Sequence, residues 1–457
     1  MIPVYDLRIM HNLISKAFVF LLILLIALGQ GEAFSYEINK NAVVLLAVKD
    51  SEGKVFSTGT GFIVDPNGTL ITNYHVLIDA VKIDAVFNNG TKSPVKEILK
   101  IDRRMDFAVL KLEGNAYSTL ELGNSSQLGE SDYTSALGYL TEDAQMDREV
   151  KPGNILQTYG FVLGIHPQAY SDFSYIYTTT PFGPGFSGGP VVNKDNKVIG
   201  LATVEGRSIN LALPIDHIKP FLNESRSISF AQMREEDKES KETFYYKGNF
   251  ALYDSGDPDK AISYFEKALK KDPDFALAHY DMAVAYREKG LIDEVIKKYK
   301  QVIQINPRFP EALSNLGGHY FMTGKTEEAI VYFKKALESY PNFIQAMSNL
   351  GAALNKLGRP EEALPYLKKA LSFDPEFGVS YYNLGNSYFA MNQFQEALQN
   401  YHKAVELGVD FLSLHWKLYE IHKKEGRSQD AEEELNIILQ IDPENPSALQ
   451  KRQKLPQ

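Results

Sequence analysis

The stretch GPGFSGGPV at residues 183–191 sets a single serine, Ser187, among four glycines and two prolines. Glycine leaves backbone N–H groups open to an oxygen that gains negative charge during a reaction. A serine hydroxyl is the nucleophile that uses such a site. The stretch therefore favours an enzyme in which Ser187 attacks the substrate.

Two upstream motifs contain the partners that a reactive serine needs. Residues 72–76 read TNYHV and include His75, and residues 105–110 read MDFAVL and include Asp106. A serine hydroxyl is a poor nucleophile until an imidazole takes its proton, and a carboxylate holds that imidazole in one tautomer. The order His75, Asp106, Ser187 is the chain order of chymotrypsin-like proteases.

Short apolar runs alternate with turn signals from about residue 41 to about residue 222. Examples of the runs are residues 42–48, 61–64 and 198–203, and turn sequences such as PNG at 66–68 and NNG at 88–90 lie between runs. Short runs separated in this way are typical of β-strands. We expect an all-β domain whose sheets close into barrels.

The residues 59–64, 72–76 and 185–190 together resemble HtrA-type trypsin-like serine proteases. The resemblance implies two barrels, the first with His75 and Asp106 and the second with Ser187. It also implies an oxyanion hole made by the N–H groups of Gly185 and Ser187, and a homo-oligomer. Phe186 departs from this family, which often has asparagine there, and the C-terminal part has no recognisable PDZ module.

The same resemblance implies a substrate pocket formed by Pro181, Leu201, Ala202 and Thr203. None of these four residues is acidic, so we predict that the pocket prefers a small or medium apolar side chain to arginine or lysine. An alternative is the nucleophile elbow of α/β-hydrolases, because residues 185–189 also fit that pattern. The elbow requires a helix after the serine, whereas PVV at residues 190–192 favours a strand.

Prolines recur on a 34-residue grid in the C-terminal half, at Pro273, Pro307, Pro341, Pro375 and Pro443. The same grid places a small residue or its substitute at Ala261, Val295, Ala329, Ala363, Ala397 and Ala431, with a large apolar residue four positions later. A fixed period of this length indicates a repeat protein. The pattern resembles tetratricopeptide repeats and predicts six helical hairpins.

Asparagines recur in the first helices of three repeats, at Asn315, Asn349 and Asn383. One hypothesis is a ladder of amides that binds the backbone of a peptide in the groove of the repeats. The alternative is that Asn-Leu-Gly is common repeat consensus. The aromatic residues Tyr299, Phe333, Tyr366 and Tyr401 are expected in the core between helices.

The N-terminus resembles a secretory signal peptide, with Arg8 and Lys16 ahead of an apolar run at residues 17–28. A run of this length is too short to span a bilayer with ease, so we expect cleavage, with a membrane anchor as the alternative. The predicted segments are 1–33 signal peptide, 34–222 protease domain, 223–241 linker, 242–445 six repeats and 446–457 C-terminal cap. The expected location is the periplasm or the outside of the cell.

The composition limits the classes of partner and cofactor that we expect. The net charge is −10 and no basic block stands out, which disfavours nucleic acid. The chain has no cysteine, which excludes disulfides and thiolate sites, and no metal or cofactor motif is present, so we expect no cofactor. The leading hypothesis is a serine endopeptidase whose repeats bind protein partners. The alternative is a scaffold or chaperone-like protein that keeps the protease fold but cleaves nothing unless a partner activates it.

Overall fold

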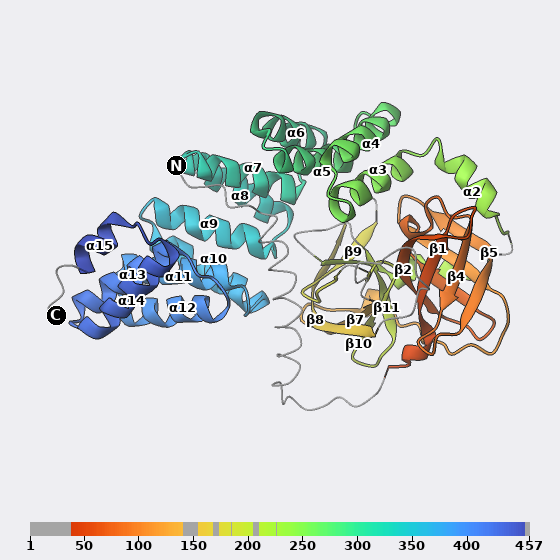
Figure 1. Ribbon diagram of the computed structural model, residues 1–457, viewed down its shortest axis with the longest axis horizontal. Coiled ribbons are helices and arrows are strands. Elements are labelled where there is room, and N and C mark those ends of the chain that lie inside the picture. The colour runs from red at the N-terminus through yellow and green to blue at the C-terminus, as the bar shows by residue number, and fades with distance from the viewer. Residues whose placement is uncertain are drawn as a thin grey trace. The chain divides into compact units, whose positions relative to one another are not determined.

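The computed structural model describes residues 38–139, 154–167, 173–183, 185–203, 210–224 and 226–452. Two closed six-stranded β-barrels come first along the chain, and pairs of antiparallel helices follow (Figure 1). The predicted fold class, an all-β double barrel followed by an all-α repeat stack, is confirmed. The predicted signal peptide at residues 1–33 lies outside the described residues. Within the described ranges, no helix has the length and apolar character needed to cross a bilayer.

The first barrel has the strand order β1-β2-β3-β6-β5-β4, and β4 closes it by pairing with β1. Its strands are β1 (Val43–Lys49), β2 (Val55–Ile63), β3 (Thr69–Thr72), β4 (Lys82–Val86), β5 (Lys92–Asp102) and β6 (Phe107–Leu112). The apolar run in β1 is almost wholly buried. Val44, Leu46 and Val48 belong to one core cluster, and the alternate residues Val43, Leu45 and Ala47 on the other face of the strand are buried as well.

The second barrel has the strand order β10-β11-β12-β9-β8-β7 and closes by pairing of β10 with β7. Its strands are β7 (Tyr133–Tyr139), β8 (Ile155–Pro167), β9 (Ser174–Thr178), β10 (Pro190–Asn193), β11 (Val198–Thr203) and β12 (Asn210–Pro214). Strand β10 begins three residues after Ser187. The α/β-hydrolase alternative is therefore wrong, because that fold needs a helix at this position.

The predicted linker, residues 223–241, contains a helix that the sequence analysis did not expect. Helix α2 (Phe230–Asp237) is capped by Ser229, whose Oγ accepts a hydrogen bond from the N–H of Gln232 at 3.1 Å. Met233 of α2 is fully buried in a core shared with the first barrel. The buried side chains of Met233 and Asp237 and one serine cap hold this short helix despite its lack of a long apolar period.

The repeats form six helical hairpins within the described residues. The first pairs α3 (Lys241–Asn249), extended by the π-helical turn η6 (Phe250–Asp254), with α4 (Pro258–Lys271). The others pair α5 (Ala276–Glu288) with α6 (Ile292–Ile305), α7 (Pro310–Met322) with α8 (Thr326–Ser339), α9 (Ile344–Lys356) with α10 (Pro360–Phe373), α11 (Gly378–Ala390) with α12 (Phe394–Glu406), and α13 (Leu412–Lys424) with α14 (Ser428–Ile441). Helix α15 (Pro446–Arg452) follows.

In four of the six described hairpins, a glycine of the first helix meets a bulky side chain of the second. A Cβ added at Gly351 would lie 2.5 Å from Leu367, and one added at Gly385 would lie 2.6 Å from Tyr401. The small residues predicted from the 34-residue grid are buried, as are Tyr299, Phe333 and Tyr401, while Tyr366 is partly buried. The repeat pattern thus encodes the contact between the two helices of each pair.

Substitution of Phe333 by alanine should destabilise the repeats, because its ring is 1% exposed and fills the interface between α7 and α8. We expect a loss of about 3–5 kcal/mol in the free energy of unfolding, measured by urea denaturation followed by circular dichroism. Val331→Ala on the same helix is the matched control, since Val331 is 51% exposed. Equal losses for the two variants would contradict the proposed packing.

Candidate active site

His75 and Asp106 come together at one end of the first barrel. His75 begins the 3-10 turn η2 (His75–Leu77) shortly after β3, and Asp106 directly precedes β6. The His75 Nδ1 and Asp106 Oδ2 atoms are 2.7 Å apart, and the His75 backbone N–H donates to Asp106 Oδ1 at 2.9 Å. The Asp106 side chain is 1% exposed. Both carboxylate oxygens therefore hold the histidine, one through its ring and one through its backbone.

Asp106 is held in an unusual backbone conformation, with φ at 55°. Residues other than glycine adopt this left-handed region rarely and at a cost in energy. Two contacts stabilise it: Asn73 Nδ2 donates to the Asp106 backbone oxygen at 2.7 Å, and Thr203 Oγ1 donates to Asp106 Oδ2 at 3.4 Å. Asn73 thus has a structural role that the sequence analysis did not assign.

The loop around Ser187 is a tight turn with glycine at both points of positive φ, 90° at Gly185 and 83° at Gly188. The N–H of Gly189 donates to the Phe186 carbonyl at 2.8 Å. The Phe186 side chain is buried in the core of the second barrel beside Gly138, where a Cβ would lie 2.7 Å from the ring. Phe186, at the position where the resemblance leads one to expect asparagine, therefore anchors the loop in the apolar core.

The Ser187 loop packs directly against the strands that lead to His75. The Thr60 N–H donates to the Ser187 carbonyl at 2.9 Å, and Thr60 Oγ1 donates to the Gly185 carbonyl at 2.6 Å. Thr72 Oγ1 donates to the Thr60 carbonyl at 2.7 Å. A Cβ at Gly188 would lie 2.2 Å from both of these threonines, so only glycine fits there. This contact brings the loops of the two barrels together. In the sequence, the one sign of it is a threonine, Thr60, between two glycines.

The predicted pocket strand lies beside the serine loop. The Ala202 N–H donates to the Gly189 carbonyl at 2.9 Å, and the Gly188 N–H donates to the Ala202 carbonyl at 3.2 Å. The Pro181 carbonyl accepts from Thr158 Oγ1 at 2.7 Å. Leu201, Ala202 and Thr203 are buried, and Pro181 is half-buried.

The asparagines of the proposed ladder take part in packing within the repeats. Asn315 Nδ2 donates to the Tyr299 hydroxyl at 3.2 Å, and Asn383 Nδ2 donates to Ser348 Oγ at 3.1 Å. Asn383 is 5% exposed, and Asn349 is half-buried on α9. These contacts favour the alternative, in which the asparagines belong to the repeat consensus.

The segment after the barrels joins the His75 loop through a buried polar cluster that sequence analysis missed. The Tyr74 hydroxyl donates to Asp237 Oδ1 at 2.6 Å and lies 2.6 Å from Thr243 Oγ1. Arg103 Nε donates to the same Asp237 oxygen at 2.8 Å. Burial, and then the Asp237 charge, raise the pKa of Tyr74 far above its ordinary value, so its hydroxyl stays protonated.

Comparisons with known proteins agree with this architecture. Residues 59–201 match the family model described as a trypsin-like peptidase domain. Residues 252–297, 285–324, 310–376 and 379–408 match tetratricopeptide repeat models. The chain therefore combines a trypsin-like peptidase domain with tetratricopeptide repeats.

Three relatives show the extent of the similarity. The chain is 37% identical over 172 residues to serine protease HTR4 of Rattus norvegicus, which is 36% of this chain and 33% of that protein. It is 33% identical over 173 residues to serine protease HTRA1A of Danio rerio, at 37% and 35% coverage. It is 30% identical over 195 residues to mitochondrial serine protease HTRA2 of Drosophila virilis, at 40% and 45% coverage. The chain thus spans less than half of each of these relatives.

Replacement of Thr60 by valine tests the junction of the two barrels. Valine keeps the shape but removes the hydroxyl that donates to the Gly185 carbonyl and accepts from the Tyr139 N–H at 3.1 Å. We expect a loss of about 1–3 kcal/mol in stability, measured by thermal or urea denaturation, because buried polar groups lose their partner. Thr60→Ser keeps the hydroxyl and should lose much less. The role of the hydroxyl would be refuted if the serine variant were the weaker of the two.

Proposed function

We propose that this protein is a serine endopeptidase that hydrolyses protein substrates with His75, Asp106 and Ser187. The observation that carries the proposal is the 2.7 Å contact between His75 Nδ1 and Asp106, combined with the Thr60 bonds that join the Ser187 loop to the same barrel. A histidine held by a buried carboxylate next to a glycine-rich serine turn suits acyl transfer. The similarity to HTRA serine proteases over the barrels supports the same chemistry.

In the proposed reaction, the Ser187 hydroxyl attacks the carbonyl carbon of the scissile peptide bond. His75 takes the hydroxyl proton at Nε2, because its Nδ1 is engaged by Asp106. The Asp106 carboxylate stabilises the imidazolium that forms. The N–H groups of Gly185 and Ser187 stabilise the oxyanion. His75 then protonates the leaving amine, and water, activated by His75, hydrolyses the acyl-enzyme.

The proposed specificity follows from the residues beside the serine. Pro181 and the strand residues Leu201, Ala202 and Thr203 bring no carboxylate to the proposed pocket, which suits a small or medium apolar side chain. The repeats supply a surface for protein partners or for further contacts with substrates, as their stacked hairpins do in general. The resemblance of residues 1–33 to a signal peptide supports action outside the cytoplasm.

The first test compares hydrolysis of casein by the protein and by Ser187→Ala. Loss of the nucleophile should lower turnover by about 10⁶-fold, because the attacking oxygen is gone. Ser118→Ala is the matched control, since Ser118 is an exposed serine of the same domain and should leave turnover unchanged. Equal turnover by the Ser187→Ala variant and the unaltered protein would refute the assignment of the nucleophile.

The second test replaces Asp106 by asparagine. The amide cannot stabilise an imidazolium and favours the wrong tautomer of His75, so kcat should fall by about 10⁴-fold. Reaction of Ser187 with a fluorophosphonate probe, followed by mass spectrometry, reports the same loss without a peptide substrate. If the unaltered protein neither cleaves casein nor reacts with the probe, with or without peptides offered to the repeats, the scaffold alternative replaces the enzyme.

A further inference from the structure

Tyr246 of the first repeat lies against the proposed catalytic histidine. The ring centroids of Tyr246 and His75 are 5.7 Å apart, with 34° between the ring planes. Tyr246 also packs edge-on to Tyr74 at 6.0 Å, and its hydroxyl donates to the Arg103 carbonyl at 3.3 Å. A side chain of the repeats therefore forms part of the immediate surroundings of His75.

Hydrogen bonds and an ion pair, in addition to the Tyr246 ring, hold helices α2 and α3 against the His75 side of the first barrel. The buried Asp237 of α2 binds Tyr74 and Arg103, as described above. In addition, Arg234 Nη1 donates to the Ala80 carbonyl at 2.6 Å, and Lys247 Nζ pairs with Asp79 at 2.8 Å. Several charge-assisted bonds, one of them on a buried carboxylate, hold the first repeat in register with the site.

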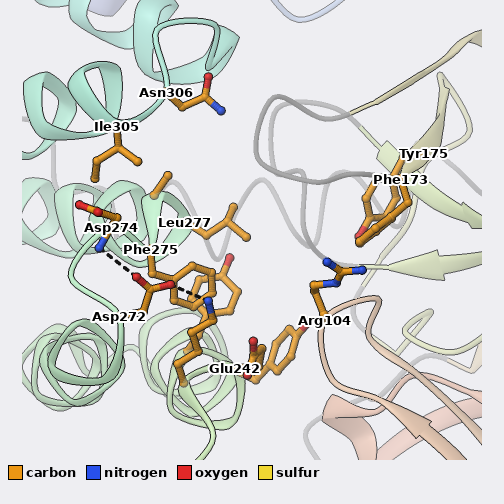
Figure 2. A pocket seen from close by; sticks show the side chains of 14 residues that line it. Arg104, Phe173, Tyr175, Glu242, Asp272, Asp274, Phe275, Leu277, Ile305 and Asn306 are labelled. Atoms are coloured by element: carbon orange, nitrogen blue, oxygen red, sulfur yellow. Dashed lines mark hydrogen bonds and ion pairs between the residues drawn. The ribbon is translucent and has the colours of Figure 1, made fainter.

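Tyr246 also lines a cavity of about 250 Å³ that the barrels and the first repeats form together. Figure 2 shows Arg104, Phe173 and Tyr175 on one side of the cavity and Phe275 and Leu277 on the other. Arg104 is two residues from Asp106, and its guanidinium lies 5.6 Å from the Phe173 ring. Two residues that line the cavity are therefore close to the proposed catalytic pair: Tyr246 contacts His75, and Arg104 is two residues from Asp106.

The chemistry of the cavity suits an apolar side chain. Its walls include the aromatic rings of Phe173, Tyr175, Tyr245, Tyr246 and Phe275. Lys241 pairs with Asp272 at 2.5 Å, which balances these two charges. Eight of the fourteen lining residues are aromatic or aliphatic, and the polar groups come from Arg104, Lys241, Glu242, Asp272, Asp274 and Asn306. Apolar surface combined with a few polar groups is usual for a binding pocket.

We propose that this cavity is a substrate subsite, built jointly by the protease domain and the first two repeats, which binds a bulky apolar side chain of an unfolded polypeptide near the scissile bond. The proposal rests on the proposed peptidase function. An extended peptide advances about 3.3 Å per residue, so a chain held at His75 reaches past Tyr246 within a few residues. Unfolded proteins expose such side chains, whereas folded proteins bury most of them.

The subsite makes the repeats determinants of cleavage specificity, in addition to any partner they bind. Leu277 is the residue that best tests this idea, because it lines the cavity from α5 and lies far along the chain from the triad. Leu277→Trp should fill the cavity and Leu277→Ala should enlarge it. Glu288→Ala at the exposed end of the same helix is the matched control.

The experiment measures kcat/KM of the full-length protein and these variants on a library of internally quenched peptides with each position around the cleaved bond randomised. We expect the unaltered protein to favour Phe, Leu, Met or Tyr at one position other than the residue whose carbonyl is attacked. Leu277→Trp should lower kcat/KM for those peptides by about 10-fold or more and shift the preference at that position to small residues. Leu277→Ala should shift it to larger ones, and Glu288→Ala should leave it unchanged.

Labelling of Ser187 by a small fluorophosphonate separates the two proposals, because the probe does not extend into the cavity. Normal labelling of the Leu277 variants with an altered preference at one position supports the subsite. Normal labelling with the same preference profile in all variants refutes the subsite and leaves the peptidase function intact. Absence of both labelling and cleavage in the unaltered protein refutes the peptidase function and the subsite with it.

Discussion

The contact between Thr60 and the Ser187 loop is the interaction on which the site depends. The two barrels contribute different parts of the proposed triad, so the triad exists only if the barrels are joined in one register. Thr60 makes that join with its backbone N–H and its hydroxyl, and Thr72 fixes Thr60 from the next strand. Gly188 allows the close approach, since any side chain there would collide with both threonines. A backbone junction of this kind is stiffer than contacts between long side chains, because few rotatable bonds separate the paired atoms.

The helical part of the chain, α2 together with the repeats, contacts both barrels. At the first barrel, Asp237 receives hydrogen bonds from Tyr74 and Arg103. At the second, Asn342 Nδ2 donates to the Leu163 carbonyl at 2.9 Å, and the Tyr340 ring lies 4.5 Å from that of Tyr177. The donors to Asp237 Oδ1 offset part of the cost of burying this carboxylate, and Oδ2 has no hydrogen-bond partner. Specific hydrogen bonds and ring contacts therefore hold the helices against the β-domain. This packing explains how a residue of a repeat comes to lie beside His75.

Much of the fold was predictable from short patterns. The 34-residue grid predicted the hairpins because the same local contact recurs in most periods, a small residue facing a large one, as at Gly385 and Tyr401. The glycine pattern around Ser187 was equally informative, because positive φ at Gly185 and Gly188 is a local requirement. Helix α2 was missed because a single buried methionine and a serine cap are too weak a signal within a charged segment. The amide ladder was disfavoured because the asparagines bond to neighbours in adjacent repeats, which a period alone does not reveal.

The sequence by itself determined the order of the elements, the identity of the candidate triad and the repeat period, because these depend on residues close together in the chain or on motifs with local geometry. Only the tertiary structure decided that Thr60 joins the barrels, that Phe186 anchors the serine loop, and that Tyr74, Arg103, Asp237 and Tyr246 meet beside His75. These contacts connect residues that are as many as 172 positions apart, as for Tyr74 and Tyr246. They arise from the packing of one barrel on the other, of the serine loop on its own barrel and of a helix on a barrel, for which the sequence carries no periodic signal, since each contact occurs once.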